Sequence, residues 1–317
     1  MQRSAALILT LLIACSATFA PAAAREITDD TGRSVEIPDR PARIVALHDI
    51  DLTIPLIELG VFPVGSHGRM GLDGHPYIRS GALLTGVDFD NSDIAYVGSV
   101  DIDMEAVAAA RPDLIVTTVT RSAPVETLQS IAPTLVFDPA QFGAPHVYRQ
   151  LAAITDSETR LAYLENRYAS AIEQLKKMTH PETITVTVMQ PNRGKIDLYH
   201  TYRALGQVLR DAGFRFPPII EAIEDGGRIQ VGIEYLPDLD ADYIFNPFRS
   251  DQGEGAEADV AAMEAIMPNF CSFLSACREG RYIMVAREEA ISNSYAALTL
   301  MISMIQSHVV KGPQPHD

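Results

Sequence analysis

Basic and other polar side chains follow the predicted strands of this sequence, at the points where each strand ends. In open α/β sheets a ligand lies beyond the carboxyl ends of the strands, so these side chains are candidates for a binding site. They are His48 and Asp49, then Ser66, His67 and Arg69, then Thr118, Thr120 and Arg121, then Gln190, Asn192, Arg193 and Lys195, then Asn246, Phe248 and Arg249, and finally Arg287. The repeated arginines indicate an anionic ligand.

Arginine recurs at these strand ends although the chain of 317 residues has a formal net charge of −16. A guanidinium group makes paired, charge-assisted hydrogen bonds to carboxylate or catecholate oxygens. The strongest candidates are Arg69 and Arg121 in the first half of the chain, and Arg193 and Arg249 in the second. The alternative for each is a solvated loop residue whose ion pairs contribute little. The pattern favours an anionic ligand over a neutral one.

Histidine and tyrosine side chains leave two further ligand chemistries open. His48 and His67 follow adjacent predicted strands and could coordinate a metal ion directly. However, a histidine at a strand end more often bonds to the backbone, and a metal ion that arrives with six donor atoms of a chelator has no open position. Tyr199, His200 and Tyr202 raise the possibility of haem, because tyrosine can be an axial ligand. The alternative is that these three residues cover the cleft or the core of a second lobe.

The segment 68–98 is too rich in glycine for us to expect regular structure. A loop of this length in a compact domain is usually functional or disordered. Its Tyr77, Arg79 and Phe89 favour a functional loop, so we include Tyr77 and Arg79 among the ligand-binding candidates.

One acidic pattern occurs twice. Glu105 lies eight residues before Asp113, which opens an apolar strand, and Glu234 lies eight residues before Asp242, which opens another. A glycine precedes each glutamate closely. A carboxylate in the first turn of a helix is favourable in any α/β protein, which is the alternative explanation. The repeated unit nevertheless places one carboxylate on each half of the chain, as a carrier that docks on a two-subunit partner would need.

Apart from Cys15 near the start of the chain, the sequence contains two cysteines, Cys271 and Cys277. In an oxidising compartment such a pair usually forms a disulfide, and closing so short a loop stabilises by about 2 kcal/mol. The alternative is two buried free thiols.

A single long helix is predicted over residues 155–178. Apolar residues recur there at spacings of three and four, which defines one buried stripe. Thr155 and Glu158 fit a capping box, Lys176 and Lys177 suit the negative end of the helix dipole, and Pro181 prevents continuation. We interpret this helix as a strut between two domains.

Strand and helix patterns alternate on both sides of this helix, so we predict an α/β fold of two lobes. Each lobe has a central sheet flanked by helices, and the long rigid helix joins them. The expected division is residues 25–154, a bridging helix over 155–180, and residues 181–317. The length favours two domains over one.

The first 24 residues resemble an export signal: Arg3 precedes an apolar stretch too short to span a bilayer, and Ala22, Ala23 and Ala24 form a cleavage site of small residues. We expect the mature protein in the periplasm. A competing interpretation is a lipoprotein site that leaves Cys15 lipidated as a membrane anchor. The net charge of −16 argues against binding to nucleic acid or to anionic membrane surfaces.

Three stretches carry a resemblance to a known family: PARIVALH, VGSVDIDMEAVAAARPDLIV and LQSIAPTLVFD, followed by the long helix. The chain resembles the periplasmic solute-binding proteins of ABC importers for ferric siderophores, haem and cobalamin, of the type with a helical backbone. The resemblance implies a ligand in the cleft between two lobes, little hinge motion, and an acidic residue on each lobe that meets arginines of the permease. Glu105 and Glu234 are the matching positions.

We therefore expect a monomeric carrier that captures a ferric siderophore and delivers it to an ABC permease dimer in the inner membrane, without a cofactor of its own. A carrier for haem or cobalamin is the alternative. A metal-dependent periplasmic enzyme is the alternative from another class, but the sequence has no P-loop, no G-x-S-x-G and no H-E-x-x-H motif.

Overall fold

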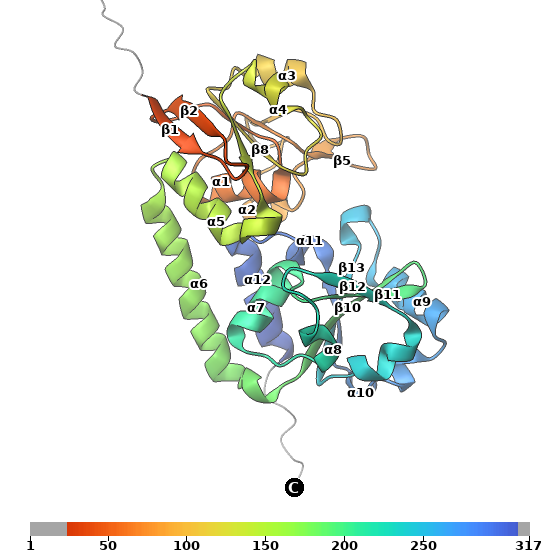
Figure 1. The fold of residues 1–317 in the computed structure, drawn as a ribbon. Coiled ribbons are helices and arrows are strands. Elements are labelled where there is room, and N and C mark those ends of the chain that lie inside the picture. The colour runs from red at the N-terminus through yellow and green to blue at the C-terminus, as the bar shows by residue number, and fades with distance from the viewer. Residues whose placement is uncertain (1–23, 310–317) are drawn as a thin grey trace, which may run out of the picture.

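The structure is a computed structural model that describes residues 24–309; the predicted export signal up to residue 23, including Cys15, lies outside these residues. Two five-stranded sheets form the centres of two lobes, and Figure 1 shows both lobes lying along one long helix, α6 (Glu158–Thr179). The fold class predicted from the sequence is confirmed. Among residues 24–309, none of the helices combines the length and the apolar character that crossing a bilayer requires.

The first lobe is built on a parallel sheet with the strand order β7-β4-β3-β8-β9. Its strands are β1 (Ala24–Thr28), β2 (Ser34–Pro38), β3 (Ile44–Ala46), β4 (Gly65–Ser66), β5 (Arg69–Met70), β6 (Pro76–Tyr77), β7 (Ala95–Tyr96), β8 (Leu114–Thr118) and β9 (Thr134–Phe137). Its helices are η1 (Asp49–Thr53), α1 (Ile54–Glu58), α2 (Gly81–Thr85), α3 (Met104–Ala109), α4 (Val125–Gln129) and α5 (Pro139–Ile154). The strands β3, β8 and β9 are fully buried, as central strands of a parallel sheet should be.

The segment 68–98 is more regular than we predicted. It contains the antiparallel pair β5–β6, the helix α2 and the strand β7. Gly68 has a specific role there, because a Cβ atom at this position would lie 2.4 Å from Cε2 of Phe89. The glycine therefore permits close packing of an aromatic ring on the backbone rather than disorder.

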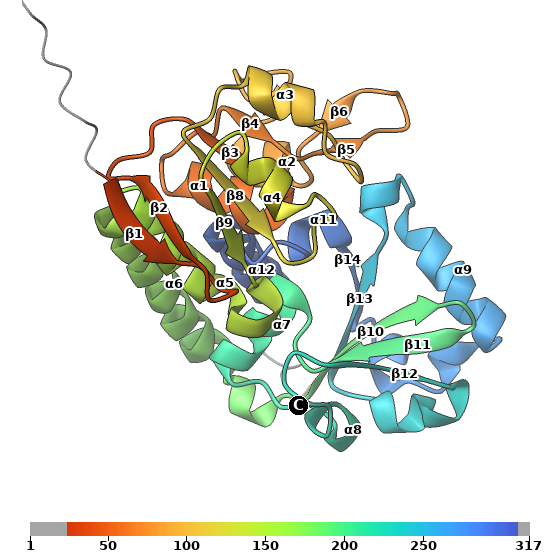
Figure 2. The same ribbon diagram turned by 45° about the horizontal axis from the view of Figure 1, so that its top comes forward.

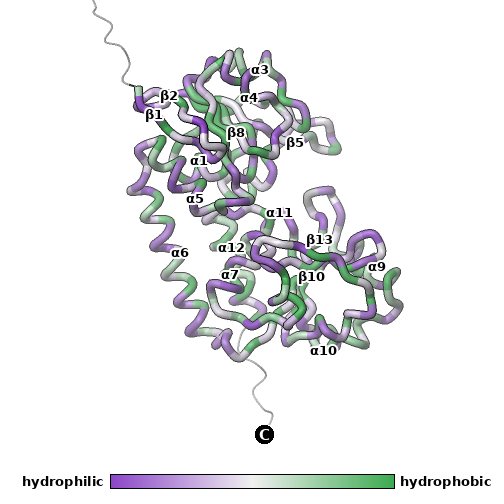
Figure 3. The backbone as a smooth tube through the Cα atoms, in the orientation of Figure 1, coloured by the Kyte–Doolittle hydropathy of each residue, from purple (hydrophilic) through white to green (hydrophobic). Residues whose placement is uncertain are grey.

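Helix α6 joins the two cores. Leu161 belongs to the hydrophobic cluster of the first lobe, and Ile172 and Leu175 belong to that of the second. In Figure 3 the helix alternates between polar and apolar residues, as expected for a helix with one buried face. Its 22 residues correspond to about 33 Å at 1.5 Å per residue.

The predicted capping box of α6 is wrong. The N-cap residue is Ser157, and its side chain makes no capping hydrogen bond. Thr155 instead ends the preceding helix α5, where its hydroxyl donates to the carbonyl of Leu151. The C-terminal signals are confirmed, since Lys176 and Lys177 lie in the last turn of α6.

The second lobe has the strand order β12-β11-β10-β13-β14, in which β10, β13 and β14 are parallel and β11 and β12 are antiparallel to their neighbours. Its strands are β10 (Val186–Asn192), β11 (Lys195–Tyr199), β12 (Arg228–Val231), β13 (Tyr243–Phe248) and β14 (Tyr282–Ala286). Its helices are η2 (Pro181–Thr183), α7 (Arg203–Ala212), α8 (Pro218–Glu221), η3 (Ile233–Leu239), η4 (Ser250–Gln252), α9 (Ala256–Ile266), η5 (Phe270–Ser272), α10 (Ser275–Arg278), α11 (Arg287–Ala290) and α12 (Tyr295–His308).

The C-terminal segment returns to the first lobe and gives the lobes a second connection. Glu58 of the first lobe accepts hydrogen bonds from the backbone N–H groups of Tyr295 and Ala296, at the start of α12. Ile291 packs within a cluster of isoleucines from the first lobe. The lobes are therefore fixed to each other at two places, while the limits that we set for them along the sequence stay a prediction.

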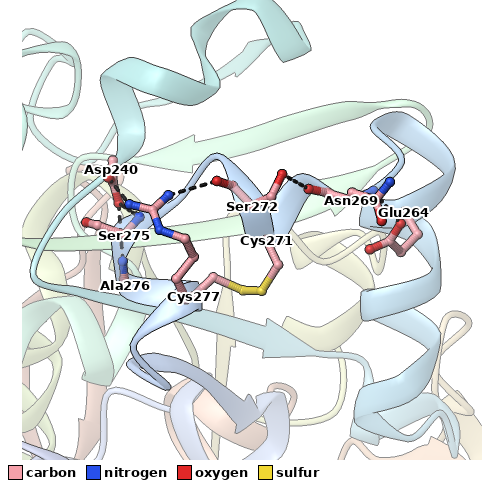
Figure 4. The surroundings of a disulfide bond; sticks show 9 residues. Asp240, Glu264, Asn269, Cys271, Ser272, Ser275, Ala276 and Cys277 are labelled. Carbon is pink, nitrogen blue, oxygen red and sulfur yellow. Dashed lines mark hydrogen bonds between the residues drawn. A yellow bond between two sulfur atoms is a disulfide. The ribbon is translucent and has the colours of Figure 1, made fainter.

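Cys271 and Cys277 form a disulfide, with their Cα atoms 5.1 Å apart, and this prediction is confirmed. Figure 4 shows the bond beside the loop that joins η5 to α10. The carboxylate of Asp240 accepts hydrogen bonds from Ser275 N, each at 2.9 Å, and so ties this loop to the rest of the second lobe.

Candidate functional site

A cavity of about 1670 Å³ lies between the lobes. It is larger than the roughly 300–1,000 Å³ of a typical small-molecule pocket, so it suits a bulky ligand. Six of the predicted ligand-binding residues line it: His67, Arg69, Tyr77, Arg79, Arg121 and Arg249. Arg287, which also follows a predicted strand, lines it as well. The structure thus brings together residues from both halves of the chain.

The first-lobe wall follows the carboxyl ends of parallel strands, as the sequence predicted. His67 comes directly after β4, and Arg121 lies three residues after β8. Figure 2 shows the β5–β6 hairpin at the edge of this lobe, on the side that faces β13 and β14. The hairpin carries Arg69 and Tyr77, which are directly paired in its register.

Asp49 is the buried centre of this wall. Its side chain is fully buried, and its Oδ2 lies 2.8 Å from Nε of Arg69. His67 Nδ1 lies 3.6 Å from the other oxygen. Burial alone would favour the neutral acid, but the neighbouring His67 and the hydrogen bonds and charge of Arg69 outweigh it and hold the pKa of Asp49 well below its usual range. Asp49 is therefore an ionised carboxylate that no solvent reaches.

His67 connects Asp49 to Arg121. Its Nε2 lies 2.9 Å from NH1 of Arg121. Because a guanidinium can only donate, Nε2 must accept, and the ring proton is left on Nδ1, which faces Asp49. Burial lowers the pKa of Arg121, and Asp49 partly opposes this effect.

The second-lobe wall comes from the ends of β13 and β14. Arg249 follows β13 directly, and Arg287 opens α11 directly after β14. The walls meet where Ser80 of the first lobe donates a hydrogen bond to the carbonyl of Glu288, at 2.7 Å. This contact closes one end of the cleft.

Charge is distributed by depth within the cavity. Five arginines and five carboxylates line it. Arg79 is only 7% exposed, whereas Asp73, Asp90 and Glu254 are exposed. The arginines balance the carboxylates of the lining in number, so the cavity is less negative than a chain with a net charge of −16 would otherwise make it.

Exposed apolar side chains lie beside the exposed carboxylates on the rim of the cavity. Leu72 is 95% exposed, Val100 80% and Met70 52%, and all three line the cavity. Leu72 reaches the opposite lobe, because a methyl group on Gly253 would lie 3.5 Å from its Cδ1. The rim offers surface that a ligand with apolar parts would cover.

Three predicted ligand-binding residues do not line the cavity. Nδ1 of His48 caps η1 by accepting from the N–H of Asp51, and burial lowers the pKa of His48 to about 4. Arg193 lies in the tight turn between β10 and β11, and Tyr199 packs edge-to-face on Tyr202. His48 thus has a structural role in η1.

Arg193 is displaced because β10 does not follow β13 to its end. The two strands pair only from Val186 to Val188, and β10 then continues in an antiparallel pair with β11, which lies beside it in Figure 2. The rule that ligands lie beyond strand ends holds for parallel neighbours, and the antiparallel β11 was not predicted.

The sequence argument missed several lining residues, among them Met70, Leu72, Val100 and Gln252. Met70 and Leu72 lie in the glycine-rich segment 68–98, whose length was the available signal, and Val100 lies two residues after it. Among the described residues, no group of three or more His, Cys, Asp or Glu side chains is arranged to hold a metal ion.

Comparison with known proteins decides the family. The profile described as "Periplasmic binding protein" matches residues 90–263, more than half of the chain. The chain belongs to the periplasmic binding protein family. One relative of this binding protein is the iron(3+)-hydroxamate-binding protein FhuD of Bacillus subtilis (strain 168), which is 27% identical over 234 residues, covering 70% of this chain and 69% of the relative.

Solved structures share the fold. Staphylococcus aureus SirA, crystallised in complex with staphyloferrin B, has a TM-score of 0.73 at 20% identity, and the match covers 90% of this chain and 98% of SirA. A Bacillus subtilis protein of the FhuD fold family, described as a component of a ferrichrome ABC transporter, has a TM-score of 0.70 at 20% identity and is covered completely. The predicted resemblance is confirmed, and the family is one of binding proteins outside the cytoplasm rather than of enzymes.

Proposed function

We propose that this protein captures a ferric siderophore in the periplasm and delivers it to the permease of an inner-membrane ABC importer. The single observation that carries the proposal is the large cleft between the lobes, lined by arginines from both sheets. An arginine fork binds the charged oxygens of a chelator, and the size of the cleft suits a metal chelate with several arms. The relatives named for hydroxamate and staphyloferrin support the ligand class.

The proposed docking on the permease depends on Glu105 and Glu234. Both are exposed in the first turn of a short helix, Glu105 in α3 and Glu234 in η3. The units that carry them have equivalent surroundings: Asp113 accepts from backbone N–H groups just before β3, and Asp242 accepts from the N–H of Thr185 just before β10. We assign one glutamate to each subunit of a permease dimer, with the carrier acting as a monomer.

A binding assay tests the ligand class. Titration of the purified protein with ferric siderophores, haem and cobalamin in a calorimeter should show saturable binding of a ferric siderophore and no turnover. Saturable binding of haem or cobalamin, with none of the ferric siderophores bound, would replace the proposal by the corresponding carrier of the same family.

A further inference from the structure

Arg69 and Arg121 line the same wall of the cleft but are held in different ways. Arg69 makes a two-point contact with the buried carboxylate of Asp49, at 2.8 Å from Nε and 3.4 Å from NH2. Arg121 contacts the ring nitrogen of His67 instead. Its own Nε is buried and has no hydrogen-bond partner among residues 24–309.

The side chains that contact Arg69 and Arg121 differ in charge. Asp49 is an anion, so the Arg69–Asp49 pair presents little net charge to a ligand. His67 faces a guanidinium with Nε2, so it serves as a neutral acceptor. Within the described part of the chain no carboxylate lies within ion-pair distance of Arg121, although Asp49 and Asp51 act on it from further away. The Arg121 charge is therefore the less compensated of the two.

The position of Arg121 increases the effect of this charge. Its guanidinium is partly buried at the cavity wall, where the effective dielectric constant is lower than in water. His67 fixes the direction of Arg121, because its Nε2 accepts from Arg121 at 2.9 Å, while its Nδ1 side lies 3.6 Å from Oδ1 of Asp49, close enough for electrostatic attraction but too far for a hydrogen bond. Arg121 is thus oriented without being neutralised.

We propose that Arg121, oriented by His67 and Asp49, is the residue of the first lobe that selects an anionic ferric chelate, and that Arg69 serves to hold Asp49. This inference rests on the proposed siderophore binding and names the ligand subclass and the residue that sets it. It makes His67 a positioning residue and not an iron ligand.

The test compares two variants that remove an arginine. Arg121→Gln removes the less compensated charge, whereas the double variant Asp49→Asn/Arg69→Gln removes an arginine together with its carboxylate and keeps a side-chain oxygen facing His67. Dissociation constants are measured by calorimetry for a ferric tricatecholate, which is anionic, and a ferric trihydroxamate, which is neutral. We expect Arg121→Gln to weaken the anionic chelate by about tenfold or more and the neutral one by less than about threefold. The double variant should weaken the anionic chelate by less than Arg121→Gln does, because it removes one cation and one anion together.

A second pair of variants tests the role of His67. His67→Ala should weaken the anionic chelate almost as much as Arg121→Gln, because Arg121 loses its acceptor. His67→Gln should restore most of the affinity, since its amide oxygen can accept from the guanidinium. A merely structural histidine would not show this rescue, and melting temperatures of all variants separate folding from binding.

The outcomes separate the two proposals. If the wild-type protein binds neither chelate, the proposed function fails. If it binds them and Arg121→Gln weakens both equally, or if the double variant loses as much affinity for the anionic chelate as Arg121→Gln does, the assignment of Arg121 is overturned while the proposed function stands.

Discussion

At the scale of single residues, the second lobe contains a buried carboxyl group close to the ligand cleft. Asp259 on α9 is only 5% exposed. When the side-chain amide of Asn246 is oriented with its nitrogen toward Asp259, this nitrogen lies 3.2 Å from Oδ2 of Asp259. Burial, reinforced by Glu254, raises the pKa of Asp259 from 3.8 to about 6, although Arg249 opposes the shift. The ionised form that prevails at neutral pH is therefore costly to the folded state.

The sign of the pH dependence follows from the raised pKa of Asp259. Between pH 4 and pH 6 the folded state binds more protons at this site than the unfolded state, so the site's contribution to stability falls as the pH rises through this window. We expect Asp259→Asn to be more stable than the wild type at pH 7 by about 1–3 kcal/mol, and the difference to disappear near pH 4. Urea unfolding at several pH values measures this. An equal effect at both pH values would contradict the shift.

Residue types at strand ends correctly predicted residues that line the cavity wherever the strands are parallel. His67, Arg121 and Arg249 line the cavity as expected. Arg193 does not, because its strand turns into a hairpin that the sequence argument did not detect. The division of roles between Arg69 and Arg121 could not be predicted, since it depends on Asp49, whose position between them only the fold determines.

At the scale of elements, periodicity predicted α6 but not the helix that precedes it. Helix α5 was missed because it contains Gly143, which breaks the helical geometry, and Pro145. Missing this helix also made Thr155 resemble a cap of α6, although its hydroxyl bonds back into α5. Local capping signals are therefore ambiguous where two helices adjoin.

The β5–β6 hairpin and the loop before α3 place the two most exposed large apolar side chains, Leu72 and Val100, on the rim of the cavity. We expect a bound chelate to cover both side chains. The double variant Leu72→Ser/Val100→Ser should then weaken binding by about tenfold, because ligand binding would remove less apolar surface from water than in the wild type. Leu83→Ser is the matched control, since Leu83 is 53% exposed and lies outside this cavity. Calorimetric titration with the same ferric siderophore compares them, and equal affinity of the double variant and the control would exclude the rim from the site.

At the scale of the whole molecule, the connections between the lobes fix the two acidic positions relative to each other. Helix α6 contributes to both cores, and Glu58 holds the start of α12 from the first lobe. A rigid spacing between Glu105 and Glu234 allows both to meet a permease at once, and two weak contacts made together bind far more strongly than either alone.

This argument gives a prediction for transport. Glu105→Arg and Glu234→Arg should each lower siderophore uptake, and the double variant should nearly abolish it, because a reversed charge repels the arginines expected on the permease. The affinity for the ligand should stay within about twofold, since neither glutamate lines the cavity. Glu126→Arg, an exposed glutamate in the first turn of α4, is the matched control and should transport normally. Uptake of radioactive iron by cells, together with calorimetry on the purified variants, measures both quantities. A large loss of ligand affinity, or equal uptake by the double variant and the control, would refute docking through these two residues.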